Sequence, residues 1–182
     1  MRLDRGASFL LLVDVQEKLA PHVGGHERLI ARAGALARAA KLLGVPVLAS
    51  EHCPDRIGRT VPQLRSLVGE DAIVSKVHFS CADEASCLAR FNALGRRQVV
   101  IAGIEAHVCV MQTALGLRER GYEPFLVEDA VGSQRAEDRA AGLQRIAAAG
   151  CSSATTEMAI FEWLHRADDV RFREALQVVK GL

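Results

Sequence analysis

Residues 98–120 read QVVIAGIEAHVCVMQTALGLRER, and this stretch decides how the rest of the chain is interpreted. The apolar run at residues 99–102, bounded by Gly103, predicts a buried strand. Apolar residues then recur at the spacing of an amphipathic helix: Val110, Ala114, Leu115 and Leu117. Cys109 therefore lies where the carboxyl end of a strand turns into a helix. In open α/β sheets this is where ligands and reactive groups gather.

Two interpretations of Cys109 follow from the residues alone. The amino end of a helix offers unpaired N–H groups and a positive dipole end, which favour a thiolate and a neighbouring oxyanion. An isolated buried cysteine is, however, more often inert packing. The position of Cys109 makes chemistry possible without requiring it.

The composition is that of a soluble globular protein of one domain, residues 1–182. Hydrophobic residues make up 49% and charged residues 25%, and the formal net charge is +1. This balance indicates neither nucleic acid nor an anionic membrane as a partner. Aromatic residues make up 4%, which leaves few platforms on which bases could stack. A small-molecule substrate is therefore expected.

Cysteine usage indicates a reducing compartment. The five cysteines are odd in number and form no CxxC motif: Cys53, Cys81, Cys87, Cys109 and Cys151. The apolar run at residues 9–13 is too short to span a membrane, and no small-residue cleavage site follows it. We expect a cytoplasmic protein with free thiols.

Strand and helix patterns alternate along the whole chain. Further strands are predicted at residues 8–15, 45–49, 72–76, 124–127 and 151–155. Helices are predicted at residues 27–43, 85–94, 135–149, 158–164 and 170–179. This alternation predicts an α/β fold of three layers (α/β/α), with a mostly parallel, six-stranded, Rossmann-like sheet.

Three groups of complementary chemistry stand at the predicted carboxyl ends of strands. Asp14 ends the first, Lys76 ends the third, and Cys109 follows the fourth. Alone, the aspartate could cap a turn and the lysine could be a surface charge. Together, an acid, a cation and a thiol at one sheet edge favour a site. Gln16 either holds the Asp14 carboxylate or closes the turn.

The polar loop SEHCPDRIGRT, residues 50–60, belongs to the same edge, and such loops often carry function. Four of its residues could be considered a metal site: Glu51, His52, Cys53 and Asp55. Neighbouring residues on an extended loop point in different directions, however, and no second ligand pair at helical spacing is present. A metal site is therefore not favoured.

Other polar residues are candidates to line a pocket at this edge. His107 is two residues from Cys109 at a helix start, so the two side chains do not face each other as a dyad. A structural or substrate-lining role is favoured for His107. His52 and His78 are candidates for pocket lining with Gln16, and Arg59 is either a surface charge or a ligand for a substrate carboxylate.

Three segments carry a resemblance to a known family: VDVQEKL around Asp14, SKVHFS around Lys76, and AGIEAHVCVMQTALGLRERGYEPFLVEDAVGS around Cys109. In order and spacing they resemble the isochorismatase-like cysteine hydrolases, which include nicotinamidases, N-carbamoylsarcosine amidohydrolase and isochorismatase. The loop SEHCPDRIGRTVPQL is most similar to the uncharacterised isochorismatase-domain-containing branch.

The resemblance implies a role for each of these residues. Cys109 would be the nucleophile, Asp14 the general base, and Lys76 the cation that lowers the pKa of both. The Ile104–Glu105 peptide is typically cis in the family, which aims the N–H groups of Glu105 and Cys109 at an oxyanion. The family also generally forms homo-oligomers, so we expect a dimer or larger.

The implied activity is hydrolysis of a small amide, ureide or related C–N substrate through a thioester, without a cofactor. Nicotinamidases carry Asp-x-His after the second strand, whereas this chain reads Glu51-His52-Cys53, which argues against a metal and against nicotinamide. The main alternative is a non-catalytic small-ligand binding or assembly protein. A nucleotide-binding module would need glycines after the first strand, and the sequence DVQEKLAPH there has none. A redox-sensing role for Cys109 would need Cys53, Cys81 or Cys151 to lie nearby in the fold.

Overall fold

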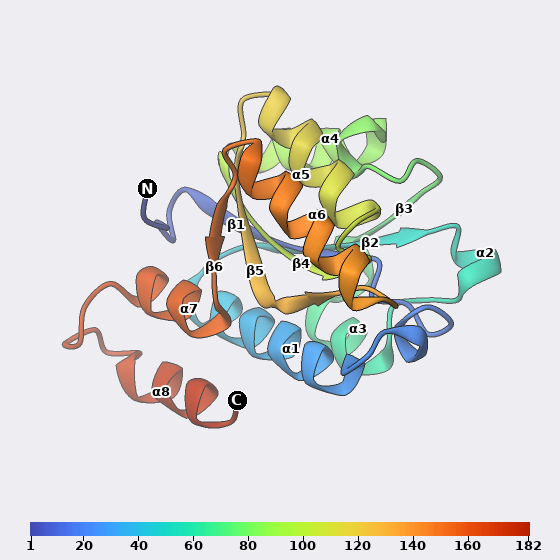
Figure 1. Cartoon of the computed structure of the whole chain (residues 1–182). Coiled ribbons are helices and arrows are strands. Elements are labelled where there is room, and N and C mark those ends of the chain that lie inside the picture. Colours follow the sequence, from blue (N-terminus) through green and yellow to red (C-terminus); the bar gives the residue numbers. More distant parts are fainter.

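Six strands form one sheet in which every neighbouring pair is parallel, in the order β3-β2-β1-β4-β5-β6 (Figure 1). The computed structural model describes all residues from 1 to 182. The strands are β1 (Ser8–Val13), β2 (Val47–His52), β3 (Ile73–Lys76), β4 (Gln98–Ile104), β5 (Glu123–Gly132) and β6 (Ser152–Ala154). The predicted six-stranded α/β fold is confirmed.

Helices cover both faces of the sheet, as Figure 1 shows. One layer contains α1 (His26–Leu43), α3 (Pro62–Val68), α7 (Thr156–Leu164) and α8 (Phe172–Lys180), and the other contains α4 (Ala85–Leu94), α5 (Cys109–Glu119) and α6 (Ala136–Ala148). The short helix α2 (Pro54–Ile57) and the 3₁₀ turns η1 (Ala20–His22), η2 (Glu70–Ala72) and η3 (Cys81–Asp83) lie in connections. This is the expected three-layer arrangement.

Two apolar clusters fill the two interfaces between sheet and helices. Side chains alternate along β1, so Leu10 and Leu12 enter the cluster under α1, while Leu11 and Val13 enter the cluster under α5. Trp163 of α7 is fully buried in the first cluster and contributes to core packing. Both faces of β1 are thus buried, as its continuous apolar sequence predicts.

The close contact between β1 and β4 requires Gly103. Its φ is +135°, and an added Cβ would lie 2.1 Å from the carbonyl oxygen of Val13. No other residue type fits there without moving one of the two central strands. Gly103 therefore lets the carboxyl ends of β1 and β4 lie side by side, with Asp14 and the segment leading to Cys109 directly beyond them.

Two strands are longer than the sequence indicates. Strand β2 continues through Ser50, Glu51 and His52, which pair with β3 although their polarity predicts a loop. Strand β5 continues to Gly132, past an irregularity in its pairing with β4. In both cases pairing with a neighbouring strand outweighs the local preference of polar residues for turns.

Asp129 on β5 joins three elements. Its Oδ1 accepts hydrogen bonds from the backbone N–H and the hydroxyl of Thr156, at 2.7 Å and 2.9 Å. Its Oδ2 lies 3.3 Å from a guanidinium nitrogen of Arg32 on α1. Asp129 therefore attaches the start of α7 to β5 and α1.

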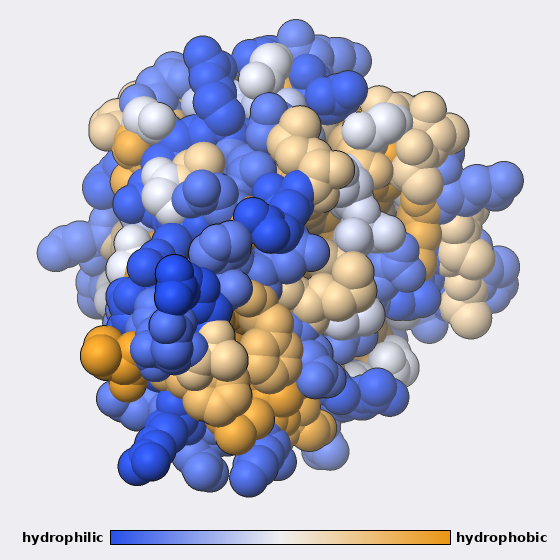
Figure 2. Space-filling view, turned by 90° about the vertical axis from the view of Figure 1, so that its left-hand side faces the viewer, coloured by the Kyte–Doolittle hydropathy of each residue, from blue (hydrophilic) through white to orange (hydrophobic).

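The surface is mostly hydrophilic and is interrupted by apolar areas, as the face in Figure 2 shows. Large apolar side chains with substantial exposure include Val77, Phe79, Met158, Phe161 and Val170. No helix has both the length and the hydrophobicity that crossing a bilayer requires.

Candidate active site

Asp14 follows β1 directly and is fully buried. Its backbone has a positive φ of 52°, which turns the chain out of the strand. Its N–H donates to the carbonyl oxygen of Ser50 (3.1 Å), and the Ser50 hydroxyl donates to Asp14 Oδ1 (2.7 Å). The end of β2 thus fixes both the backbone and the carboxylate of Asp14.

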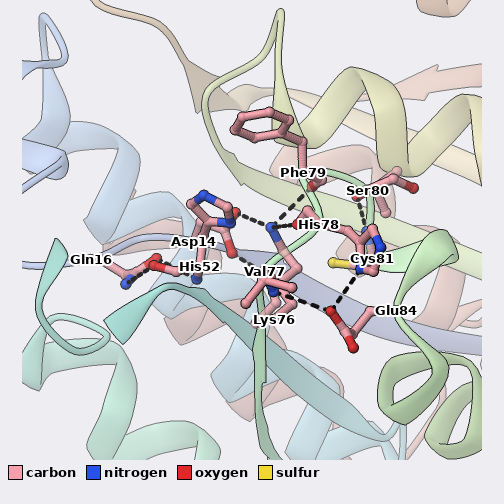
Figure 3. Close-up of polar contacts among 12 residues, drawn as sticks. Asp14, Gln16, His52, Lys76, Val77, His78, Phe79, Ser80, Cys81 and Glu84 are labelled. Atoms are coloured by element: carbon pink, nitrogen blue, oxygen red, sulfur yellow. Dashed lines mark hydrogen bonds and ion pairs between the residues drawn. The ribbon is translucent and has the colours of Figure 1, made fainter. Parts of the chain in front are cut away.

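Lys76 reaches Asp14 from a strand that is not its neighbour. Strands β3 and β1 are separated by β2, a distance of about 10 Å that the lysine and aspartate side chains span together. The ammonium Nζ donates to Asp14 Oδ2 at 2.7 Å and to the carbonyl oxygens of His78 (3.1 Å) and Phe79 (3.0 Å), as Figure 3 shows. All three N–H donors of the ammonium therefore have protein acceptors.

The surroundings keep Lys76 charged. Burial lowers its pKa, but the negative charges around it, that of Asp14 first, outweigh burial and place the pKa above its ordinary value. Both side chains of the pair have no exposed surface. The result is a buried ion pair in which every N–H of the lysine ammonium donates a hydrogen bond.

Cys109 is the first residue of α5 and is 6% exposed. The N–H groups of Glu105 and Cys109 donate to no protein acceptor, since the intervening turn places other amides on the Glu105 carbonyl. The Ile104–Glu105 peptide bond is cis. Two free donors thus lie at the start of α5, where the helix dipole also favours negative charge.

The thiol of Cys109 is protonated at neutral pH, unlike the thiolate that its helix position predicts. Burial, and next the charge of Asp14, raise its pKa, and the opposing effect of Lys76 is smaller. A nearby carboxylate thus holds the proton on sulfur while standing ready to accept it.

Three neighbours of the site are absent from the sequence-based candidates. Ser50 binds Asp14 as described, and Cys81 is buried close to Lys76. The N–H of Cys81 donates to the hydroxyl of Thr113 at 2.9 Å, and Thr113 is one turn after Cys109 on α5. None of the three had a readable signal in the sequence, because Ser50 becomes a strand residue only when β3 pairs with it, and Cys81 and Thr113 come from distant segments.

Gln16 is fully buried and binds backbone groups of two loops. Its side-chain amide donates to the carbonyl oxygens of His52 (3.1 Å) and Gly58 (2.6 Å), and its Oε1 accepts from the His52 N–H at 2.8 Å. The amide therefore closes the turns beside the site and makes no hydrogen bond to the Asp14 carboxylate.

His52 is the last residue of β2 and pairs in register with Lys76. Its ring stacks on that of Phe79, with centroids 5.1 Å apart and planes 29° apart. Its Nδ1 is buried without a hydrogen-bond partner. Burial and the charge of Lys76 lower the pKa of His52, while Asp14 and the His78 carbonyl act in the opposite direction. His52 is therefore neutral at pH 7.

The side chains of the remaining predicted lining residues make no hydrogen bond to Asp14 or Lys76. His78 is exposed and its Nδ1 is 3.0 Å from a carboxylate oxygen of Glu84. Arg59 is exposed, and its guanidinium makes no hydrogen bond or ion pair within the chain. His107 contacts the hydroxyl of Ser133 at 3.0 Å through Nδ1, which ties the turn before α5 to the end of β5.

Glu51 faces away from His52. Its Oε1 accepts from the N–H and hydroxyl of Thr60 (2.7 Å and 2.9 Å) and from Arg65 on α3 at 2.9 Å. Successive side chains of a strand point to opposite faces, so Glu51 and His52 cannot chelate one ion. No three His, Cys, Asp or Glu side chains gather in an arrangement suited to a metal.

The sequence matches the isochorismatase domain over residues 8–158. Isochorismatase domain-containing protein 2A of Mus musculus is 34% identical over 179 residues, covering 96% of this chain and 83% of the mouse protein. Isochorismatase domain-containing protein 1 of Danio rerio is 32% identical over 178 residues, covering 98% of this chain. The chain spans 62% of the length of that fish protein.

Solved structures match over nearly the whole chain. MAR1 ribonuclease from Caenorhabditis elegans gives a TM-score of 0.91 at 31% identity and covers 99% of this chain and 93% of its own. YcaC from Pseudomonas aeruginosa, solved with hexane-2,5-diol and covalent acrylamide, gives 0.91 at 26% identity, covering 97% and 91%. The domain match and the relatives above 30% identity lead to one conclusion: the chain belongs to the isochorismatase family.

Proposed function

We propose that the protein is a cysteine-dependent hydrolase of a small amide, ureide or related C–N substrate, with Asp14, Lys76 and Cys109 as its catalytic triad. The observation that carries the proposal is the buried Lys76–Asp14 pair at 2.7 Å beside the Cys109 thiol. Mere packing does not call for this arrangement, because burying two charges is costly.

In the first step Asp14 accepts the proton of Cys109 as the sulfur attacks the substrate carbonyl carbon. The substrate oxygen becomes an oxyanion, for which the free N–H groups of Glu105 and Cys109 are suited donors. Asp14 then returns the proton to the leaving nitrogen as the C–N bond breaks, and an amine and a thioester remain.

In the second step Asp14 accepts a proton from water as the water oxygen attacks the thioester. Collapse of this intermediate releases the carboxylic or carbamic acid, and the proton returns to sulfur. Lys76 orients the carboxylate and keeps it ionised between steps, because its ammonium is bonded to Oδ2. No cofactor or metal is needed for either step.

The protonated resting thiol supports a base-assisted attack. An attacking thiol must lose its proton, and Asp14 is the carboxylate whose charge acts on the Cys109 thiol. The covalent acrylamide in the similar Pseudomonas YcaC structure is consistent with a nucleophilic site in that protein, since acrylamide is an electrophile that thiols attack.

Two other functions receive less support. The description of the C. elegans neighbour names a ribonuclease, but a net charge of +1 and 4% aromatic residues offer little for RNA. A non-catalytic small-ligand binding or assembly protein could retain the fold, yet it would not need a buried acid, cation and thiol in contact.

The test is turnover of small primary amides and ureides by the wild type and by Cys109→Ala, with ammonia release as the measured signal. We expect Cys109→Ala to lose at least about 1000-fold in rate for any substrate found. The matched control is Cys151→Ala, a buried cysteine at the start of the β6 region, which should retain the rate. Retained turnover in Cys109→Ala overturns the proposal.

We also propose that the protein is a cytoplasmic homo-oligomer. The five cysteines are all free, as suits a reducing compartment. The exposed side chains of Phe79, Met158 and Phe161 favour association, because apolar side chains are stabilised by removal from water. Light scattering coupled to size-exclusion chromatography tests this, and a monomer at micromolar concentration contradicts it.

A further inference from the structure

Two of the three acceptors of the Lys76 ammonium come from an exposed loop. The carbonyl oxygens of His78 and Phe79 lie 3.1 Å and 3.0 Å from Nζ. The side chains of Val77 and Phe79 in this loop are 69% and 51% exposed. Such a segment is more mobile than the strands unless specific contacts hold it, so what fixes these carbonyls matters for the position of Nζ.

The loop is fixed at both of its ends. At the first, a carboxylate oxygen of Glu84 accepts from the Val77 N–H at 3.1 Å and lies 3.0 Å from His78 Nδ1. At the second, the ring of Phe79 stacks on that of His52, with centroids 5.1 Å apart and an interplanar angle of 29°. Figure 3 shows these residues around Lys76.

The backbone of His52 is held in place by β3 and by Gln16. His52 is the last residue of β2 and pairs in register with Lys76 of β3. Its N–H donates to the buried Gln16 amide at 2.8 Å. Strand alternation places its side chain on the same face as Ser50, whose hydroxyl binds Asp14. The ring thus stands beside the Asp14–Lys76 pair without a hydrogen bond to it.

We propose that His52 is a positioning residue: by stacking on Phe79 it fixes the two loop carbonyls that hold the Lys76 ammonium on Asp14. The proposal rests on the proposed function for its catalytic meaning. The stack itself is a contact between rings, and the Nδ1 atom of the imidazole has no hydrogen-bond partner.

The chemistry of the imidazole supports a packing role. A protonated ring would bring a second cation beside the Lys76 ammonium, and a neutral ring avoids this repulsion. An aromatic ring of similar size at position 52 should therefore stack on Phe79 in the same way. His52→Phe keeps the stack and also removes the buried nitrogen that lacks a partner, which makes it the conservative variant for rescue.

The experiment is NMR of the Lys76 ammonium in ¹⁵N-labelled protein, with its hydrogen exchange with water as the readout. We expect His52→Ala and Phe79→Ala each to speed exchange by about 2- to 10-fold, the worth of one aromatic pair. The double variant should exchange no faster than either single variant, because both remove the same contact. His52→Phe should retain the wild-type rate.

Val77→Ala is the matched control, since Val77 is an exposed apolar residue of the same loop whose side chain is outside the stack. It should leave the exchange rate unchanged. Equal exchange in Phe79→Ala and wild type, or multiplied effects in the double variant, overturns the proposal. If His52→Ala does not fold, the half-exposed Phe79 still provides the test.

The same samples separate this proposal from the proposed function. Iodoacetamide labelling of Cys109 in wild type and Asp14→Asn reports whether Asp14 acts on the thiol. If the labelling rate of Cys109 is the same in Asp14→Asn and wild type, while the exchange rate of Lys76 changes in the His52 and Phe79 variants, the triad is contradicted and the positioning role of His52 stands. If the labelling rate changes in Asp14→Asn but the exchange rate is unchanged in the His52 and Phe79 variants, only the positioning role is contradicted.

Discussion

The Nζ atom of Lys76 and the Oδ2 atom of Asp14 lie 2.7 Å apart although their strands are not neighbours in the sheet. The pair crosses the end of β2, and Ser50 from that strand binds the second carboxylate oxygen. Side chains at the carboxyl ends of three strands are therefore linked at one edge. A buried ion pair is weak as a source of stability, so its place here is better explained by chemistry.

Removing the charge of Asp14 should destabilise the fold. Asp14→Asn leaves the buried Lys76 ammonium without its counter-charge, which costs about 3–5 kcal/mol in other proteins. We expect urea denaturation to show a loss of this size in the free energy of unfolding. The matched control is Asp55→Asn on the exposed α2 surface, and Asp14→Asn/Lys76→Met should recover part of the loss. A loss below about 1 kcal/mol, the value of a surface pair, would contradict the buried pair.

Alkylation of Cys109 should be slow at neutral pH and should keep rising above about pH 10. Burial raises the pKa of its thiol above the ordinary value of 9.0. An unperturbed thiol is half ionised at its pKa of about 8.5, so its alkylation rate levels off above about pH 10. Mass spectrometry of each cysteine peptide after iodoacetamide labelling checks this, with urea-unfolded protein as the reference. A plateau for folded Cys109 below about pH 8 would support a resting thiolate instead.

The same raised pKa has a consequence for stability. The unfolded chain releases the Cys109 proton at a lower pH than the folded protein does, so the contribution to stability is complete below the unfolded pKa. It is lost as pH rises from about 9 through the folded pKa. In urea titrations, the free energy of unfolding should therefore fall less between neutral and strongly alkaline pH in Cys109→Ala than in the wild type.

Gly103→Ala should be among the most destabilising single changes in the chain. The added Cβ would lie 2.1 Å from the Val13 carbonyl oxygen, so the two central strands must separate. We expect a loss of at least about 4 kcal/mol, or no soluble protein. Gly44→Ala also has a positive φ but meets nothing within 4 Å, and it should lose only about 1–2 kcal/mol. Similar losses in both variants would show that strand separation is not the cause.

The sequence predicts the sheet well because its central strands are apolar on both faces. Residues 8–13 and 98–104 admit few alternatives, and the right-handed crossover rule then brings the ends of these strands to one edge. Asp14, Lys76 and Cys109 could be chosen from that edge before any coordinates, since only their place at strand ends was needed.

What the sequence could not predict depends on pairing and burial. Ser50 and His52 look like loop residues until β3 pairs with them, and only then does alternation assign their faces. The pKa of Cys109 depends on how much water its surroundings exclude, which no local pattern encodes. Cys81 approaches the site through Thr113, a contact between segments 32 residues apart.

Lys76 stands on an edge strand, which has one neighbour in the sheet and half-buried residues before it. Edge strands open locally at a lower free energy than the central ones. Fraying of β3 would withdraw the ammonium from Asp14 while β1, β2 and β4 stay paired. The fraction of molecules with an assembled site is therefore set by a local opening equilibrium, and a substitution in β3 could disable the site without changing the melting temperature.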